Sequence, residues 1–132
     1  MDIHTALFAN EAFYLAFSQR DFPAMDRLWA QASPLLCIHP GWPALTEREA
    51  ILASWHNILQ NPATGYAVPH HAQVLAYGTL ATVVCYEEIQ GEIFVASNTF
   101  IEEDGEIRLI QHQAGPCAHP PQPESKAAPV MQ

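Results

Sequence analysis

The segment Leu80-ATVVCYEEIQGEIFVASNTFI-Glu102 carries the pattern that decides the fold of this chain. Apolar and polar side chains alternate along most of it, which is typical of strands with one buried face. Gln90-Gly91 interrupts the alternation, and such a two-residue connection predicts a tight hairpin in which Ile89 pairs with Glu92. The segment therefore predicts two long antiparallel strands, at 80–89 and 92–102.

Two more strands are predicted beside this hairpin, at 68–77 and 106–114, because both segments show the same two-residue period. Gly78 separates the first of them from the hairpin. Glu103-Asp-Gly105 suits a three-residue loop with Gly105 in the left-handed conformation. The C-terminal half is thus expected to be a meander of four strands.

The N-terminal part shows helical spacing instead. Between 6 and 18, Phe13, Tyr14 and Phe17 share one face at the spacing of an amphipathic helix. Asp21 is placed to cap a second helix, and Pro23 is tolerated in the first turn of that helix. Two helices are therefore expected before the strands begin.

A third helix is expected after Thr46-Glu-Arg-Glu49, which reads as a capping box. In that motif the hydroxyl and the carboxylate satisfy each other's free backbone N–H groups. Trp55 lies on the apolar face that follows, and Asn61-Pro62 would end the helix.

A short apolar strand, 35–39, is expected between the second and third helices, and it ends in the sequence Cys37-IHPG-Trp42. The fixed φ of Pro40 and the freedom of Gly41 would turn the chain there and hold the imidazole of His39 at the end of the strand. Trp42 would cover this turn from outside.

Helices followed by a meander of long strands predict an α+β fold, in which a curved antiparallel sheet wraps around three N-terminal helices as a cone. Such a cystatin-like roll leaves a concave pocket at one end. Residues 1–114 are expected to form a single domain. Residues 115–132 contain five prolines and few bulky side chains, so they are expected to be a flexible tail.

The charge excludes several classes of partner. Five Lys and Arg residues against fourteen Asp and Glu residues give a formal net charge of -9, which argues against nucleic acids and anionic membrane surfaces. No apolar run has the length of a membrane span, and the first residues lack the features of a secretory signal, so a cytoplasmic protein is expected. The three cysteines share no CxxC spacing and are expected to be buried thiols.

The chain resembles the nuclear-transport-factor-2-like superfamily, and within it the SnoaL-like and ketosteroid-isomerase-like branch, over roughly residues 6–114. The residues that carry the resemblance are Phe13-Tyr14, Arg20-Asp21, His39-Pro-Gly-Trp42, Ser54-Trp55, Tyr86-Glu-Glu88, Ser97-Asn-Thr-Phe100 and His112. The resemblance implies a pocket, but this fold hosts isomerases, cyclases, dehydratases, hydrolases and assembly domains.

Steroid isomerases of this branch have an aspartate base at the end of the first strand, and the resemblance implies that His39 takes its place. Their oxyanion hole uses a tyrosine on the first helix and a protonated aspartate on a later strand. The matching positions are Phe13, with Tyr14 beside it, and Asn98. The changed base and the amide disfavour ketosteroid isomerisation itself.

Strand parity points to the same pocket. If 90–91 is a two-residue turn and 103–105 a three-residue loop, Asn98 lies opposite Val83 and Ile110, and Ala96 lies opposite Cys85 and His112. Glu87, Asn98 and His112 then share one face with Val83, Phe94 and Ile110. Polar groups on an apolar concave face are typical of a ligand site, although a one-residue register error would turn all of them outward.

Each candidate has a structural alternative. His39 is expected to act as a general acid or base, to bind substrate, or to be a core histidine satisfied by backbone carbonyls. Glu87 would orient a histidine or act as a base with a raised pKa, unless it is simply solvated. Asn98 would donate to an oxyanion or play a structural part. His112 would be structural, catalytic, or part of a two-histidine, one-carboxylate metal triad. No HxH spacing in the sequence supports such a triad.

The pocket wall is expected to be aromatic. Its predicted members, as substrate-binding residues, are Phe13, Tyr14, Trp29, Trp42, Trp55 and Phe94. We therefore expect a small apolar or weakly polar organic ligand, with proton-transfer chemistry of the isomerase, cyclase, dehydratase or hydrolase kind and no cofactor or metal. The alternative is a non-catalytic ligand-binding or assembly domain.

A homodimer is expected through the outer face of the sheet. The apolar and weakly polar side chains assigned to this face are Val95, Thr99, Ile101 and Leu109. An uncovered row of this kind would be an aggregation-prone patch on a monomer.

Overall fold

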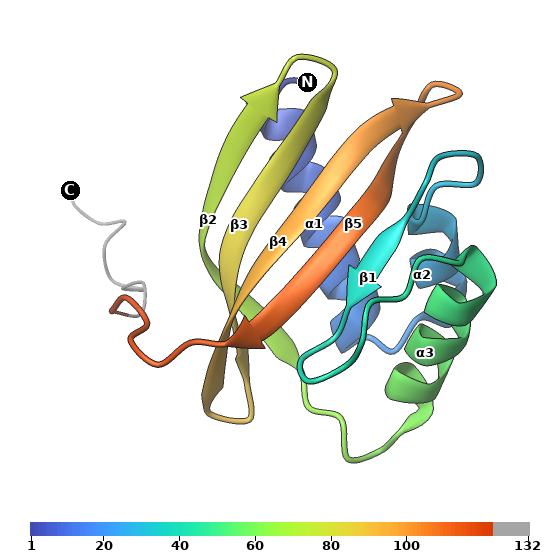
Figure 1. Ribbon diagram of the computed structural model, residues 1–132. Helices are drawn as coiled ribbons and strands as arrows, with labels where there is room; N and C mark the ends of the chain where they lie inside the picture. Colours follow the sequence, from blue (N-terminus) through green and yellow to red (C-terminus); the bar gives the residue numbers. More distant parts are fainter. Residues whose placement is uncertain (123–132) are drawn as a thin grey trace.

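The computed structural model describes residues 1–122, and residues 123–132 of the predicted tail lie outside the described part. Helices and strands follow each other in the order α1 (Ile3–Ser18), α2 (Phe22–Leu28), β1 (Leu36–Ile38), α3 (Arg48–Gln60), β2 (Ala67–Tyr77), β3 (Leu80–Ile89), β4 (Glu92–Glu103) and β5 (Glu106–Pro116). The strands form one curved, open sheet in the order β1-β5-β4-β3-β2, and α1 runs across one of its faces (Figure 1). The predicted α+β class is confirmed. The sheet is mixed, because β1 pairs with β5 in parallel.

The β3–β4 hairpin has the predicted register. Ile89 pairs with Glu92, and further along Glu87 faces Phe94 and Val83 faces Asn98. The two turn residues, Gln90 and Gly91, both have positive φ (53° and 83°), as the tight turn requires.

The β4–β5 hairpin differs from the prediction. Its turn has two residues, Asp104 and Gly105, both with positive φ, so Glu103 pairs with Glu106 and no three-residue loop forms. A bulge then follows, in which Thr99 pairs with Gln111 while Phe100 pairs with Leu109. The extra residue left between the two partners in β5 is Ile110.

The shorter turn and the bulge correct two predictions about β5. Asn98 lies opposite His112, not opposite Ile110. Leu109, expected on the outer face, is fully buried in the core. His112 nevertheless lies on the inner face as expected. The shorter turn and the extra residue each shift β5 by one position in the same direction, and a shift of two positions keeps the face.

The first two helices form as predicted. One face of α1 is buried and includes Phe13, Tyr14 and Phe17, and the helix begins earlier than expected because Asp2 accepts a hydrogen bond from the N–H of Thr5. In α2 the side chain of Asp21 accepts from the N–H of Ala24. Among the described residues, no helix is both long enough and apolar enough to cross a membrane.

The predicted capping box of α3 is wrong. The helix begins at Arg48 after the N-cap residue Glu47, which makes no side-chain capping bond. The chain before it is held extended, because Leu45 exchanges two backbone hydrogen bonds of 2.9 Å with Cys37. The helix ends at Gln60, before Asn61-Pro62, as expected.

The edge strand β2 is interrupted. Its pairing with β3 shifts register between His70 and Gln73, and His71 has a positive φ of 54°. The strand β5, between β1 and β4, continues to Pro116, two residues beyond the predicted domain end. The N–H of Cys117 then donates to the carbonyl of Ile93 at 3.0 Å. The flexibility of the tail stays a prediction.

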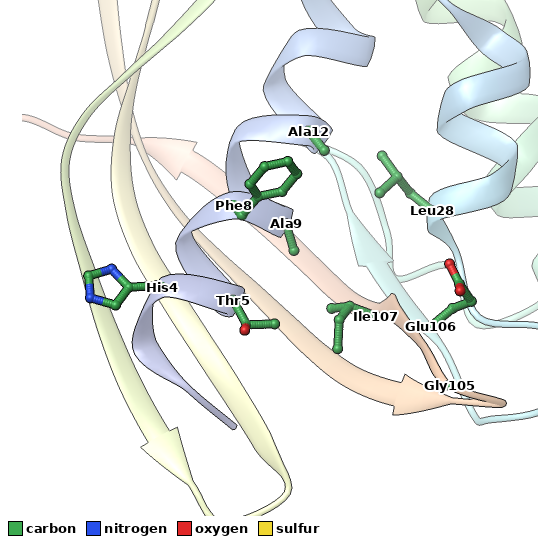
Figure 2. Close-up of a pocket in the computed structure, with 9 residues that line it drawn as sticks. All are labelled: His4, Thr5, Phe8, Ala9, Ala12, Leu28, Gly105, Glu106 and Ile107. Carbon is green, nitrogen blue, oxygen red and sulfur yellow. The ribbon is translucent and has the colours of Figure 1, made fainter.

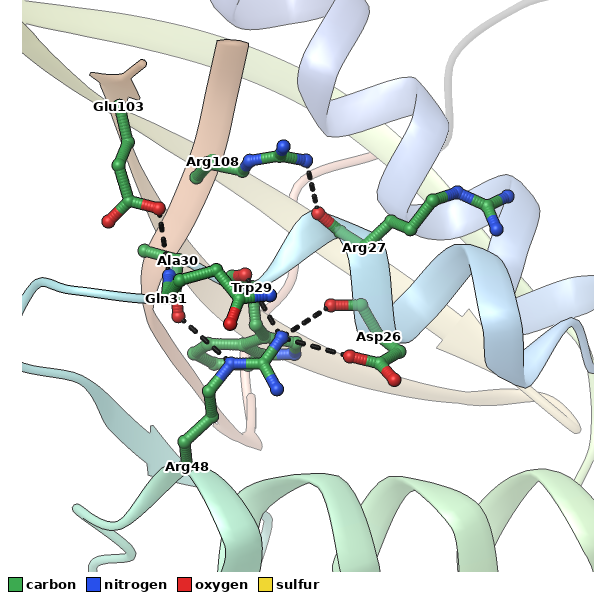
Figure 3. Close-up of polar contacts among 8 residues, drawn as sticks. All are labelled: Asp26, Arg27, Trp29, Ala30, Gln31, Arg48, Glu103 and Arg108. Carbon is green, nitrogen blue, oxygen red and sulfur yellow. Dashed lines mark hydrogen bonds and ion pairs between the residues drawn. The ribbon is translucent and has the colours of Figure 1, made fainter.

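One arginine joins the N-terminus of α3 to the end of α2 (Figure 3). The guanidinium of Arg48 donates to the carbonyl of Ala30 at 3.1 Å and to both the carbonyl and the carboxylate of Asp26 at 2.9 Å. The carbonyl of Trp29 lies at 3.4 Å. These four acceptors lie in the last turn of α2 and in the two residues after it, so the planar donor fork of an arginine suits them.

We predict that Arg48→Lys lowers the free energy of unfolding by about 1–3 kcal/mol, because a lysine cannot reach all of these acceptors. The matched control is Arg27→Lys, since the Arg27 guanidinium is exposed and points away from the cluster. Urea unfolding of both variants measures the difference. Equal stabilities would show that the Arg48 contacts contribute nothing.

Candidate functional site

A cavity of about 260 Å³ lies between the inner face of the sheet, α1, α3 and the turn that follows β1. Its lining residues are Phe17, His39, Pro40, Trp42, Trp55, Ile58, Glu87, Ile89 and His112. Three of the four residues predicted to be catalytic, His39, Glu87 and His112, thus line one apolar cavity. The fourth, Asn98, is fully buried behind His112.

His39 is positioned by the turn predicted from Pro40-Gly41. Gly41 has φ +82°, and the N–H of Trp42 donates to the carbonyl of His39 at 2.9 Å, which closes a tight turn. The imidazole ring lies 5.0 Å, between ring centroids, from both Trp42 and Trp55. Trp42 remains 45% exposed, so it borders the cavity from the solvent side.

The Nε2 atom of His39 lies 2.9 Å from the hydroxyl of Ser54 on α3. Burial lowers the pKa of His39 from 6.5 to about 4, because the charged ring would lose its hydration. His39 is therefore neutral at neutral pH.

Glu87 reaches the cavity from β3 and is only 2% exposed. Its carboxylate accepts a hydrogen bond of 2.6 Å from the hydroxyl of Tyr14 on α1. Burial raises the pKa of Glu87 from 4.5 to about 7, and the hydrogen bond from Tyr14 opposes this rise. The same burial, with the nearby carboxylate, raises the pKa of Tyr14 well above its ordinary value. Tyr14 is thus a hydrogen-bond donor and Glu87 a group that changes charge near neutral pH.

His112 reaches the cavity from β5. Its Nδ1 atom lies 2.6 Å from the side-chain oxygen of Asn98, and its ring centroid lies 6.3 Å from that of His39. Burial, and then the nearby His39, lower the pKa of His112 from 6.5 to about 3. Both imidazole rings of the cavity are therefore neutral at neutral pH.

The predicted aromatic wall is only partly at the cavity. Trp42 and Trp55 line it, and Phe13 packs behind them with its ring centroid 5.0 Å from that of His112. Trp29 is fully buried beside β5, where it bridges to Leu109, and it does not border the cavity. Phe94 lies opposite Glu87 in the sheet, outside the lining. Tyr14 acts through its contact with Glu87.

Two side chains that contact the candidate residues were missed by the sequence predictions. Asn10, only 2% exposed, accepts a hydrogen bond of 2.9 Å from the amide of Asn98. It lies one helical turn before Tyr14, so its position on the buried face of α1 was a usable signal. Ser54, the partner of His39, has no such signal, because its role depends on how α3 docks against the turn after β1.

A metal centre is not formed in the part of the chain that the structure describes. No group of three or more His, Cys, Asp and Glu residues there is arranged to hold a metal ion. The two-histidine, one-carboxylate triad left open by the sequence is therefore not supported, even though its members share a cavity.

A second hollow, of about 520 Å³, lies between α1, the end of α2 and the β4–β5 turn (Figure 2). It is larger than the first, but its wall consists mainly of apolar side chains such as Phe8, Leu28 and Ile107. The titratable groups at its rim, His4 and Glu106, come from opposite sides and make no contact with each other. The convergent chemistry is in the smaller cavity.

The smaller cavity can therefore do acid–base work on a neutral molecule. Glu87 can give or take a proton near neutral pH, because its pKa is near 7. The two imidazoles can accept hydrogen bonds, and the indoles of Trp42 and Trp55 supply apolar surface. Asn98 has no spare donor for an oxyanion, because its amide nitrogen already donates to Asn10 at 2.9 Å and to Tyr14 at 3.2 Å.

Comparisons with known proteins point to one family. Residues 7–118 match the sequence profile of the SnoaL-like domain. A solved structure of a proposed dehydratase of the NTF2-like family from Streptomyces avermitilis is 30% identical, with a TM-score of 0.81, and the match covers 89% of this chain and 97% of that one.

Two other relatives carry different descriptions. A solved structure from Thiobacillus denitrificans, described as a proposed association domain of calcium/calmodulin-dependent protein kinase type II, is 25% identical with a TM-score of 0.75 and covers 83% of this chain and 92% of that one. The F-box protein SKIP8 of Arabidopsis thaliana is 23% identical over 108 residues, which are 80% of this chain. The chain spans about half, 46%, of the length of that relative.

The buried titratable groups predict how stability depends on pH. The pKa of His39 and of His112 is lowered on folding, to about 4 and about 3, so the free energy of unfolding falls as the pH drops below 6.5. Glu87 acts oppositely: its pKa is raised to about 7, so its contribution is fully present below pH 4.5 and is lost as the pH rises through 7.

We therefore expect Glu87→Gln to lose stability more steeply than the parent between pH 7 and pH 4.5, by up to about 1.4 kcal/mol per pH unit. Urea unfolding at several pH values measures both slopes. Glu92→Gln is the matched control, because Glu92 is exposed on the partner strand of the same hairpin. Parallel pH profiles for the parent and Glu87→Gln would show that Glu87 titrates normally.

Proposed function

Because the chain belongs to the SnoaL-like domain family, we propose that it binds a small uncharged organic molecule in the 260 Å³ cavity and catalyses proton transfer on it with its own side chains. The observation that carries this proposal is a carboxyl group, Glu87, that is buried in an apolar cavity beside two neutral imidazoles. Burying an ionisable carboxyl group beside neutral partners lowers the stability of the fold. Such groups concentrate at active sites.

Glu87 is the best candidate for the group that moves the proton. An efficient general acid or base has a pKa close to the working pH, and the pKa of Glu87 is about 7. His39 and His112, with their lowered pKa values, are weak bases by comparison. We assign them the task of orienting the ligand, although the sequence suggested a proton-transfer role for His39.

Dehydration is the reaction class that fits this set of groups best. In a β-hydroxy ketone, the ionised Glu87 would remove a proton from the carbon between the carbonyl and the carbinol. The C–O bond then breaks, and the hydroxyl leaves as water with a proton returned by the carboxylic acid, so that one side chain is base and then acid. The proposed dehydratase from Streptomyces avermitilis, 30% identical to this chain, supports this class.

A non-catalytic ligand-binding or assembly domain is the second candidate. Two observations favour it. A relative 25% identical to this chain is described as an association domain. The cavity is also smaller than the roughly 300–1,000 Å³ of most ligand sites. The outer face of the sheet, which α1 does not cover, would then be the functional surface, as a homodimer contact (Figure 1).

The catalytic proposal predicts a difference between adjacent glutamates. We expect the protein to convert 3-hydroxycyclohexanone slowly to cyclohexenone. The absorbance of the product measures the rate. Glu87→Gln should lower the rate by at least about 100-fold, while Glu88→Gln should leave it within about twofold, since Glu88 lies on the solvated side of β3. Equal rates for the parent and Glu87→Gln would contradict the role of Glu87. Saturable binding without turnover would favour the second candidate.

The dimer proposal makes a separate prediction. Val95, Thr99 and Ile101 lie on the outer face and are partly exposed, Val95 at 37%. We expect light scattering at tens of micromolar to give twice the 14.6 kDa of one chain, and Val95→Glu to restore the monomer by placing a charge in the contact. The control is Leu15→Glu, at a site 56% exposed on α1 rather than on the outer face of the sheet. A parent protein that is monomeric under these conditions would contradict the dimer.

A further inference from the structure

The two imidazoles that line the cavity each have one nitrogen bonded inside the protein and one that is not. His39 uses Nε2, at 2.9 Å from Ser54 and 3.6 Å from the thiol of Cys37, and His112 uses Nδ1, at 2.6 Å from Asn98. In a neutral imidazole one nitrogen carries the proton and the other accepts hydrogen bonds. The partners of the bonded nitrogens therefore decide what the rings offer to a ligand.

Ser54 can only accept from His39. Its hydroxyl oxygen lies 2.6 Å from the carbonyl oxygen of Ile51, and at that distance the hydroxyl proton must lie between the two oxygens. The lone pairs of Ser54 then face His39. The thiol of Cys37, a weak donor 3.6 Å from the same nitrogen, is the weaker partner, so Nε2 of His39 carries the ring proton. Nδ1 of His39 is left without one.

Asn98 can likewise only accept from His112. Its amide nitrogen donates to Asn10 at 2.9 Å and to Tyr14 at 3.2 Å, and Tyr14 in turn gives its own proton to Glu87 at 2.6 Å. The amide oxygen is therefore the atom that faces His112, and Nδ1 of His112 must carry the proton. Nε2 of His112 is left without one.

Both free nitrogens are accessible to a ligand. Among the described residues, the buried side-chain nitrogens and oxygens that lack both a partner and contact with solvent are the indole nitrogens of Trp29 and Trp55. Nδ1 of His39 and Nε2 of His112 make no hydrogen bond to the described residues, yet they are not sealed. Since both rings border the cavity, that is where these atoms meet solvent.

We infer that Ser54 and Asn98 are positioning residues that fix the two histidines in opposite tautomers, so that the cavity presents two hydrogen-bond acceptors and selects ligands that carry hydroxyl groups over ligands with only a carbonyl. This inference rests on the proposed ligand cavity. It favours hydroxylated substrates, as in dehydration, over isomerase substrates whose only polar group is a carbonyl. It also favours release of the dehydrated product, because that product has lost its donor.

The tautomers can be measured without any ligand. In protein labelled with ¹⁵N-histidine at pH 7, long-range ¹H–¹⁵N NMR should show His112 protonated at Nδ1 and His39 at Nε2. Ser54→Ala should let the ring of His39, but not that of His112, populate both tautomers, and Ser54→Thr should restore the single tautomer of His39. Asn98→Leu should let the ring of His112 alone populate both tautomers. The opposite tautomers in the parent, or unchanged tautomers in these variants, would overturn the positioning roles. If Asn98→Leu does not fold, the Ser54 pair still decides the outcome for His39.

The ligand class is tested with a matched pair of probes, cyclohexanol and cyclohexanone, which differ in donor capacity but hardly in size. We expect cyclohexanol to bind about tenfold more tightly than cyclohexanone, as measured by titration of the chemical shifts of His39 and His112. Ser54→Ala should reduce this preference. Equal or reversed affinities would overturn the selection of donors. Binding of neither probe would overturn the proposed ligand cavity itself, while the tautomers would still decide the roles of Ser54 and Asn98.

Discussion

One extra residue in β5 determines which side chains meet inside this protein. With the two-residue turn at Asp104-Gly105, an uninterrupted ladder would place Gln111 opposite Asn98 and turn His112 to the outer face. The bulge between Leu109 and Gln111 shifts the second half of the strand by one position. Leu109, on the turn side of the bulge, fills the core, and His112, beyond the bulge, borders the cavity. The cavity and the hydrogen-bonded chain behind it depend on this irregularity.

The consequence is a chain of hydrogen-bonded polar side chains in the middle of an apolar core. Asn10, Tyr14, Glu87, Asn98 and His112 are nearly inaccessible to solvent, and each has a partner in the chain. Leaving one such buried group unpaired costs about 1–3 kcal/mol, so the chain is stabilising only while it is complete. This is a cost that a purely structural core of leucine and valine would not carry. Its presence is the physical reason to regard this part of the molecule as functional.

Much of the fold could be predicted because it follows from local patterns. The period of two in β3 and β4, together with Gln90-Gly91, gave the correct hairpin register, and Asp21 and Asn61-Pro62 marked real helix boundaries. The predicted capping box did not form. The residues before α3 are held extended by the pairing of Leu45 with Cys37, a backbone contact that the capping motif does not encode.

The site was harder to predict, because it depends on features without a sequence signature. No sequence motif predicts the bulge at Ile110. The face of His112 was predicted correctly although the loop length was wrong, because the shorter turn and the bulge together shift β5 by two positions. Glu87 was placed by the hairpin alone and faces the cavity as parity predicted. The docking of Ser54 against His39 and of Asn10 against Asn98 joins segments that only tertiary packing brings together.

The interruption of β2 affects a different property, the tendency of an open sheet to recruit other chains. β2 is the long free edge of the sheet, and a regular edge of 11 residues would offer a continuous row of unpaired N–H and C=O groups. Pro69 removes one donor, and the left-handed backbone at His71 breaks the row in the middle. Neither half of the edge is then long enough or flat enough to template a foreign strand, so the same sheet can stay open and curved around its cavity without growing.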